Sequence, residues 1–536
     1  MSIEYFVEGK IKTQIKGNYL AFSKENIVHN TACSVEQQGK ETGVKYQDAK
    51  KLNPNDTPSN LIDVSLNLFF DGTQNNKTNT EAGKDYAESN HEDDSYTNDY
   101  SNVARGYDAL DPKAENQVAE YIEGIGTEDL KSESLPFTTL PNNIGIPFGM
   151  GNRGVEAKVT KGCIKGAKAL SIYAGQKGIR LKVNVYGFSR GATAARHFLH
   201  IATKTARMSY TQGGQKIQIS PPYDGGRSEE IYLFTDKDGS INTFLSRYGY
   251  FGACLLHNDV NPVEIAFNFV GLYDTVASFG PVHSNDTIDL GLDAVNKAHF
   301  VLQLAADDEF RDNFDLTDID SAGVKGLTFT LPGVHSDIGG CYVEMAEETS
   351  DLYKEEGSGK ECEKFRNILI SEGWYNDKPE EIWIERLSPH IHGSDARFLL
   401  KGRRKLHNTY DKIPLNSMFH YSKQFGVKYL EDIINDNHKI QEFFLIKINS
   451  QLTGYMNACN EVRNTYIQEY NKNNTSGDYI DKLKRISYLD YIRPEDLKKL
   501  RHQYLHWSAS VTKTGLGPRV GFVTDARNRK RKIQYG

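Results

Sequence analysis

A serine in a pentapeptide bounded by glycines is the residue best suited to chemistry in this chain. Gly187-Phe188-Ser189-Arg190-Gly191 matches the pattern G-x-S-x-G and lies between an apolar run and helix-forming residues. A sharp strand-to-helix turn exposes the serine hydroxyl, and small residues on both sides allow the close backbone approach that it needs. The helix N-terminus also favours the oxyanion that forms when a carbonyl is attacked. We therefore predict that Ser189 is a nucleophile, whereas a chance match or a simple helix cap is the alternative.

A serine nucleophile needs a base to accept its proton and an acid to orient that base. In α/β hydrolases the three follow the chain order serine, acid, histidine. Asp274 lies two residues after the apolar run 267–272, and His335 follows the run 327–331 through a Pro-Gly turn. We predict Asp274 as the acid and His335 as the general base. Asp337 is the alternative acid, although it could instead cap the turn that follows.

Acyl transfer also needs two donors for the oxyanion, and one is usually the N–H of the residue after the nucleophile. The apolar run 66–70 ends in the turn DGTQNN, whose Gly and Asn residues leave backbone N–H groups free. We predict an oxyanion hole made by the N–H groups of Arg190 and of Gly72 or Thr73. An ordinary Asx turn is the alternative.

Four apolar runs of strand length must position these residues. They are LNLFF at 66–70, LKVNVY at 181–186, FNFVGL at 267–272 and LTFTL at 327–331. Such runs fit central strands of a parallel sheet covered on both faces, and helical stretches such as 156–174 and 192–206 separate them. Ligands bind beyond the carboxyl ends of parallel strands, where each run ends in a polar cluster. The predicted fold is therefore α/β, of the α/β-hydrolase type, with a mostly parallel doubly wound sheet.

The chain is predicted to have three parts. Residues 1–60 form a polar appendage, 61–345 form the α/β-hydrolase core, and 346–536 form a helical cap or accessory region that could face a membrane. The last part ends in the basic run 527–532, which we interpret as a solvated tail, with contact to anionic lipid headgroups as the alternative. We also predict a helix over 297–310.

Composition excludes several classes of protein. The 536 residues are 38% hydrophobic and carry a net charge of −7, which permits a large core and does not indicate nucleic-acid binding. No run approaches the ~20 apolar residues of a membrane span, and no secretory signal begins the sequence. The six cysteines are scattered without a CxxC pair or zinc-ligand spacing, so we expect reduced packing residues, no metal site and no cofactor.

Six segments in order resemble a known family, the type VI secretion lipase effectors, specifically the first Tle family of phospholipases. The segments are FFDGTQNN at 69–76, SNVAR at 101–105, YIEGIGT at 121–127, GFSRGA at 187–192, YDTV at 273–276 and PGVHSDIGG at 332–340. One such motif would be unspecific, but six in the same order are not. The resemblance spans roughly residues 60 to 510 and implies a triad on Ser189, Asp274 and His335.

The resemblance also implies what the spacing cannot show. It implies phospholipase A activity on membrane glycerophospholipids. It also implies that the protein leaves the producer's cytoplasm without a signal peptide and is delivered into the target cell, to its periplasm. A type VI spike or adaptor protein and a cognate immunity protein are the implied partners, with residues 1–60 as a hypothetical loading segment. The alternatives are a hydrolase of soluble esters and a non-catalytic cargo protein, because the fold alone does not choose between them.

Overall fold

The computed structural model describes ten stretches of the chain, which are residues 61–83, 94–131, 151–223, 230–236, 238–277, 287–387, 396–473, 476–513, 515–523 and 529–536. The chain divides by its contacts into two units, Met1–Asn60 and Leu61–Gly536. The predicted N-terminal appendage lies outside the described residues, so the fold is that of the second unit.

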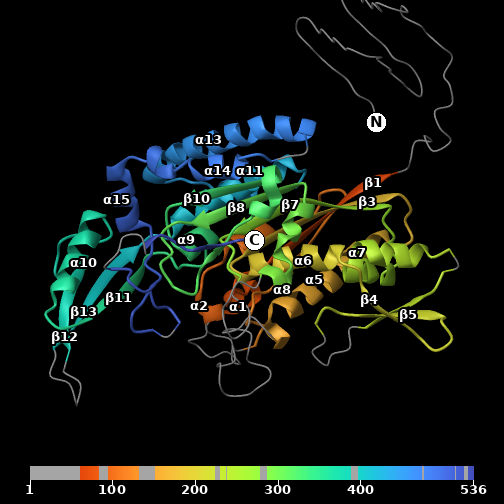
Figure 1. Cartoon of the computed structure of the whole chain (residues 1–536), viewed down its shortest axis with the longest axis horizontal. Coiled ribbons are helices and arrows are strands. Elements are labelled where there is room, and N and C mark those ends of the chain that lie inside the picture. Colours follow the sequence, from red (N-terminus) through yellow and green to blue (C-terminus); the bar gives the residue numbers. More distant parts are fainter. Residues whose placement is uncertain are drawn as a thin grey trace, which may run out of the picture. The chain divides into compact units, whose positions relative to one another are not determined.

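A six-stranded parallel sheet forms the centre of this unit (Figure 1). Its order is β10-β8-β7-β3-β1-β2, made of β1 (Ile62–Phe70), β2 (Gln117–Ile122), β3 (Ile179–Phe188), β7 (Glu264–Tyr273), β8 (Phe300–Ala306) and β10 (Gly326–Leu331). The chain continues from β1 to β2 on one side and builds all later strands on the other. The order therefore reverses between β1 and β3, and such a switch point opens a crevice at the carboxyl ends of the strands. The predicted parallel α/β sheet is confirmed.

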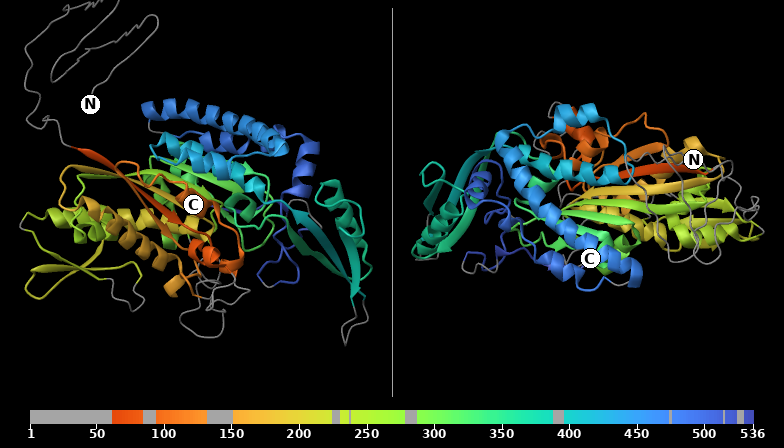
Figure 2. Two further views of the ribbon diagram at one scale, coloured as in Figure 1. Left: turned by 180° about the vertical axis from the view of Figure 1, so that it is seen from behind. Right: turned by 90° about the horizontal axis from the view of Figure 1, so that it is seen from above.

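Helices cover both faces of the sheet (Figures 1 and 2). Alternate residues of β1 point to opposite faces, so that Leu68 and Phe70 join one buried cluster and Phe69 joins the other. On the first face lie α5 (Val155–Ala169), α6 (Arg190–Thr203) and, packed against them, α7 (Ser240–His257); on the second lie α3 (Asn102–Asp108), α11 (Lys412–Gln424) and α13 (Phe443–Asn473). This double burial explains why the central strands are nearly continuous apolar runs.

Two strands of the sheet differ from the sequence prediction. The edge strand β2 was not predicted, because its sequence QVAEYI mixes polar and apolar residues. The predicted helix over 297–310 is wrong, since the strand β8 (Phe300–Ala306) runs through its middle. Every residue of β8 is buried, so its sequence FVLQLAA has no polar face to distinguish a strand from a buried helix.

The region after residue 345, predicted to be helical, also contains a three-stranded antiparallel sheet. This sheet has the order β11-β13-β12 and is made of β11 (Ala346–Glu356), β12 (Ile382–Leu387) and β13 (Arg397–Leu406). With α10 (Lys360–Ser371) it lies at one end of the unit, away from the parallel sheet (Figure 1). Charged residues are frequent in these strands, as in AEETSDLYKEE, so they lack the apolar runs of buried strands.

The remaining elements are short or peripheral. They are α1 (Lys77–Ala82), α2 (Asp94–Thr97), α8 (Thr287–Leu290), α9 (His335–Gly339), α12 (Glu431–Ile433), α14 (Tyr479–Lys484), α15 (Pro494–Gln503), a small sheet of β4 (Arg207–Tyr210), β5 (Lys216–Ser220) and β6 (Ile231–Phe234), and the paired strands β9 (Leu316–Thr317) and β14 (Ile533–Gln534). Within the described stretches, no helix has both the length and the apolar character needed to cross a membrane. The five cysteines in those stretches are buried and free.

Candidate active site

The turn between β3 and α6 holds Ser189 in a conformation that few residues adopt. Ser189 has φ 58° and ψ −128°, which costs a non-glycine residue on the order of 1–3 kcal/mol. A Cβ atom on Gly187 would lie 2.4 Å from the carbonyl oxygen of Gly191, and one on Gly191 would lie 2.2 Å from that of Asp71. Only glycine fits these two positions, so the backbone packing explains the spacing of the pentapeptide.

Asp274 and His335 meet through their side chains at the same edge of the sheet. Asp274 follows β7, His335 begins α9, and His335 Nδ1 lies 2.5 Å from Asp274 Oδ2 with both side chains buried. Burial would raise the pKa of Asp274, but the charge of Arg531 and hydrogen bonds from His335 and Arg531 hold this pKa below its ordinary value. Burial lowers the pKa of His335, although Asp274 opposes this change. At neutral pH the pair is therefore a carboxylate and a neutral imidazole.

The serine turn is joined to His335 and to the residue before Asp274. The ring of Phe188, the residue before Ser189, has its centroid 4.6 Å from that of His335. The N–H of Ser189 donates to the carbonyl oxygen of Tyr273, the residue before Asp274, at 3.0 Å. Among the described residues no hydrogen bond joins Ser189 Oγ to His335, and His335 Nε2 is buried without a partner. Catalytic hydrogen bonds often tighten only when substrate binds, so this geometry leaves Nε2 available for one.

Asp337, the alternative acid, makes an Asp–His pair of its own. Its Oδ1 atom lies 2.7 Å from His506 Nδ1, and its Oδ2 atom accepts from the N–H of Val334 at 2.9 Å. The His506 ring stacks on Tyr342 with centroids 3.7 Å apart. None of the hydrogen bonds that this carboxylate makes within the described stretches involves His335, so the geometry favours Asp274.

The loop after β1 contains the predicted oxyanion donors. The N–H of Gly72 donates to Asp71 Oδ1 at 2.7 Å, so it is engaged, and Thr73 is the stronger candidate of the two. Thr73 Oγ1 accepts from Arg190 Nε at 2.9 Å, which joins this loop to the serine turn.

Asp71 anchors that loop to its neighbours. The carboxylate accepts from Ser101 Oγ at 2.6 Å and from the hydroxyl of Tyr121 at 2.5 Å. Burial raises the pKa of Asp71 to about 6, while these hydrogen bonds and that of Gly72 oppose the rise.

Charged residues that the sequence did not indicate surround the Asp274–His335 pair. Glu309 is buried, forms a bidentate ion pair with Arg311 at 2.8 Å for each contact, and accepts from the N–H of His335 at 3.2 Å. Burial would raise the pKa of Glu309, but the Arg311 guanidinium holds it well below its usual range. Glu309 follows β8, so a correct strand prediction there would have placed this acid at the same sheet edge.

Arg531 is the second site residue that was not predicted. Its burial shows that the basic run is not a solvated tail at this position. Its guanidinium donates to both carboxylate oxygens of Asp274, at 2.5 and 2.9 Å, and its side chain is 5% exposed. Residues 527 and 528 of the basic run lie outside the described residues.

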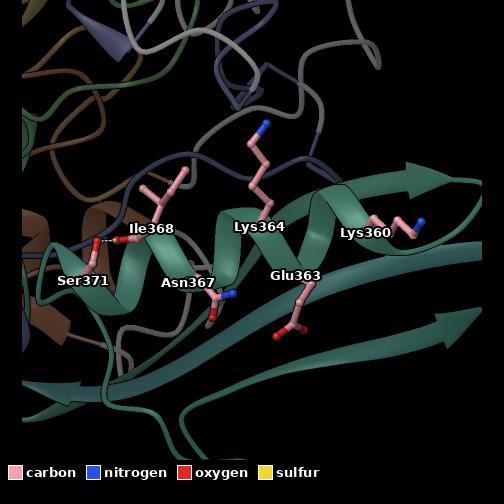
Figure 3. A pocket seen from close by; sticks show the side chains of 6 residues that line it. All are labelled: Lys360, Glu363, Lys364, Asn367, Ile368 and Ser371. Carbon is pink, nitrogen blue, oxygen red and sulfur yellow. Dashed lines mark hydrogen bonds between the residues drawn. The ribbon is translucent and has the colours of Figure 1, made fainter.

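One surface pocket lies away from this site (Figure 3). It is lined along α10 by Lys360, Glu363, Lys364, Asn367, Ile368 and Ser371. No residue from the edge of the parallel sheet contributes to it, so we assign it no part in the chemistry.

The parallel sheet with a serine at a strand-to-helix turn is an α/β fold of the hydrolase type. Residues 65–355 match the family described as "T6SS, Phospholipase effector Tle1-like, catalytic domain". This matched range contains every predicted site residue. The chain therefore belongs to this family of type VI secretion phospholipase effectors, and it is a lipolytic hydrolase by family. No curated protein matches it.

Solved structures that are similar to the chain include the following two. The Tle1 effector bound to the VgrG spike of the type 6 secretion system shares 18% identity, with 91% of this chain and 99% of that chain covered and a TM-score of 0.49. An uncharacterized protein from Pseudomonas aeruginosa shares 15% identity, with 89% and 65% covered and a TM-score of 0.37.

Proposed function

We propose that this effector is a phospholipase A that hydrolyses acyl esters of membrane glycerophospholipids, with Ser189 as nucleophile, His335 as general base and Asp274 as the orienting acid. The observation that carries the proposal is the 2.5 Å contact between His335 Nδ1 and Asp274 Oδ2, at the sheet edge that also bears the strained turn of Ser189. Family membership supports the lipid substrate.

Each side chain has a defined part in the proposed reaction. His335 Nε2 accepts the proton of Ser189 Oγ as this oxygen attacks the ester carbonyl carbon. The N–H groups of Arg190 and Thr73 stabilise the resulting oxyanion. Collapse of the intermediate breaks the bond to the glycerol oxygen, which takes the proton from His335 and leaves an acyl enzyme. Water then attacks the acyl carbon, with His335 again as base, and releases the fatty acid.

The environment of His335 supports its part as base. An acceptor of the serine proton must be neutral before the reaction, and burial lowers the pKa of His335 in that direction. Asp274 holds the Nδ1 atom as a donor, which leaves the lone pair on Nε2. An unpaired buried nitrogen costs stability, so the unpartnered Nε2 supports a reactive rather than a structural histidine.

Lipid mass spectrometry of defined phospholipids tests the substrate and the nucleophile together. Ser189→Ala should lower kcat by a factor on the order of 10⁵–10⁶, whereas Ser240→Ala should not change it. Ser240 is a matched control because it too lies at the N-terminal end of a helix, α7, but is exposed.

Each of three outcomes of this assay has one meaning. Fatty acid released by the wild type and Ser240→Ala, but not by Ser189→Ala, supports the proposal. Turnover of short soluble esters alone would make the protein a soluble-ester hydrolase. If a fluorophosphonate probe does not label Ser189 and no ester is cleaved, the protein is a non-catalytic cargo.

Delivery and partners belong to the same proposal, and family membership supports them. The substrate membrane would be that of a target cell reached through its periplasm, and the producer would hold an immunity protein. A spike or adaptor would load the effector through residues 1–60. Unchanged secretion after deletion of these residues would exclude that loading role.

A further inference from the structure

The segment 529–536 adds a short strand beside the active site, at the end of the chain marked C in Figure 1. Its strand β14 pairs in parallel with β9. The N–H groups of Leu316 in β9 and of Asp318 just after it donate to the carbonyl oxygens of Lys532 and Gln534, at 3.0 and 2.9 Å. The strand β9 is itself bonded to the residue after Asp274, because Thr317 N donates to the Thr275 carbonyl oxygen at 3.0 Å. The segment is thus connected through β9 to the residue that follows the acid of the proposed triad.

This segment carries Arg531, whose side chain is buried. Besides its two bonds to Asp274, its Nε donates to the carbonyl oxygen of Phe314 at 2.9 Å and one terminal nitrogen donates to that of Ala306 at 3.0 Å. Such a bidentate, fully oriented guanidinium is a strong and geometrically specific partner for a carboxylate. The side chain of its neighbour Lys532 is instead exposed and lies 3.3 Å from the Asp312 carboxylate.

The carboxylate of Asp274 is oriented by all its donors together. Oδ1 accepts from Arg531 and from the N–H of Ala306 at 2.8 Å, and Oδ2 accepts from Arg531 and His335. Arg531 is the only donor of these that contacts both oxygens. It therefore fixes the plane of the carboxylate, and with it the direction in which His335 is held.

We propose that Arg531 is a positioning residue for the hydrolytic reaction, delivered to Asp274 by the segment 529–536. This inference rests on the proposed triad, in which Asp274 orients the base. Arg531 does not touch substrate, and it acts through the orientation and charge of the acid.

The charges around His335 predict how removal of Arg531 changes the pKa of this histidine. Asp274 and Glu309 carry negative charges there, Arg311 and Arg531 carry positive charges, and the rings of Phe188 and Phe314 that pack against His335 are uncharged. These four charges sum to zero when His335 is neutral. Without Arg531 the sum is negative, which favours the protonated imidazolium. The pKa of His335 should then rise, and less of the base should be available at neutral pH.

Four variants test the inference. Arg531→Met should lower kcat by about 10²-fold with little change in KM, the size of effect expected when a catalytic group is misplaced. The acidic limb of its kcat/KM profile should move to higher pH. Arg531→Lys should keep the limb near its wild-type position, because the charge remains, but lose part of kcat, because one ammonium cannot bind both oxygens. Added guanidinium at non-denaturing concentration should partly restore Arg531→Ala, and Lys532→Met should resemble the wild type.

The controls separate a wrong inference from a wrong triad. Asp274→Asn and Ser189→Ala are measured in parallel, and activity in both would reject the proposed function itself. If both are inactive while Arg531→Met has wild-type kcat and pH dependence, only the inference is rejected. A low kcat with an unmoved acidic limb and no guanidinium rescue also rejects it, since Arg531 would then be merely structural. If Arg531→Met does not fold, Arg531→Lys and the rescue experiment decide.

Discussion

Replacement of Asp274 by asparagine tests the proposed acid most directly, because the side chain keeps its shape. The carboxylate accepts hydrogen bonds from Ala306, His335 and Arg531. An amide offers one acceptor oxygen and one donor nitrogen. If the oxygen stays with Ala306 and Arg531, the NH₂ group faces His335 Nδ1, which must then become an acceptor. The proton moves to Nε2, and His335 cannot accept the proton of Ser189.

The expected loss follows from this wrong tautomer. In a Ser-His-Asp site this change lowers kcat by about 10⁴-fold, equivalent to about 5 kcal/mol of transition-state stabilisation. Arg531 also loses its buried counterion, and breaking such a pair costs about 3–5 kcal/mol of stability. Initial rates of fatty acid release at saturating phospholipid should therefore be measured together with thermal unfolding, at a temperature where the variant is folded.

Asp337→Asn is the matched control, because it makes the same change in the second Asp–His pair. It weakens the bonds to His506 and Val334, so we expect a loss of about 1–3 kcal/mol in the free energy of unfolding and a kcat close to the wild type. A nearly silent Asp274→Asn beside a severe Asp337→Asn would refute the reasoning and make Asp337 the acid.

Two further predictions follow from the site. The pKa of His335 is lowered by burial, and the neutral imidazole is the base, so kcat/KM should fall with decreasing pH only below about 6.5, the ordinary histidine value; an acidic limb above that pH would contradict the assignment. Gly191→Ala places a Cβ atom 2.2 Å from the Asp71 carbonyl oxygen, so it should cost about 1–3 kcal/mol of stability and most of the activity. Gly517→Ala, where a Cβ atom meets no neighbour within 4 Å, should change neither, and equal melting curves for the two variants would exclude the steric explanation.

Four of the six central strands could be predicted from local patterns in the sequence. The runs that became β1, β3, β7 and β10 are apolar and bounded by turn residues, so both their structure and the polar clusters at their ends could be anticipated. The strand β8 could not, because burial on both faces removes the alternation that identifies a strand. Missing that strand also hid Glu309 at its carboxyl end. Arg531 was misread for a different reason: a basic run indicates solvent exposure unless a buried acid is known to face it.

The ion pair between Arg531 and Asp274 joins residues that are 257 positions apart in the chain. Bringing together residues so far apart costs loop-closure entropy, and folds with many such contacts form slowly. The orientation of the acid therefore depends on completed tertiary structure rather than on the sheet alone. A chain whose parallel sheet and serine turn are formed, but whose segment 529–536 is not docked, therefore lacks the bidentate partner of the acid.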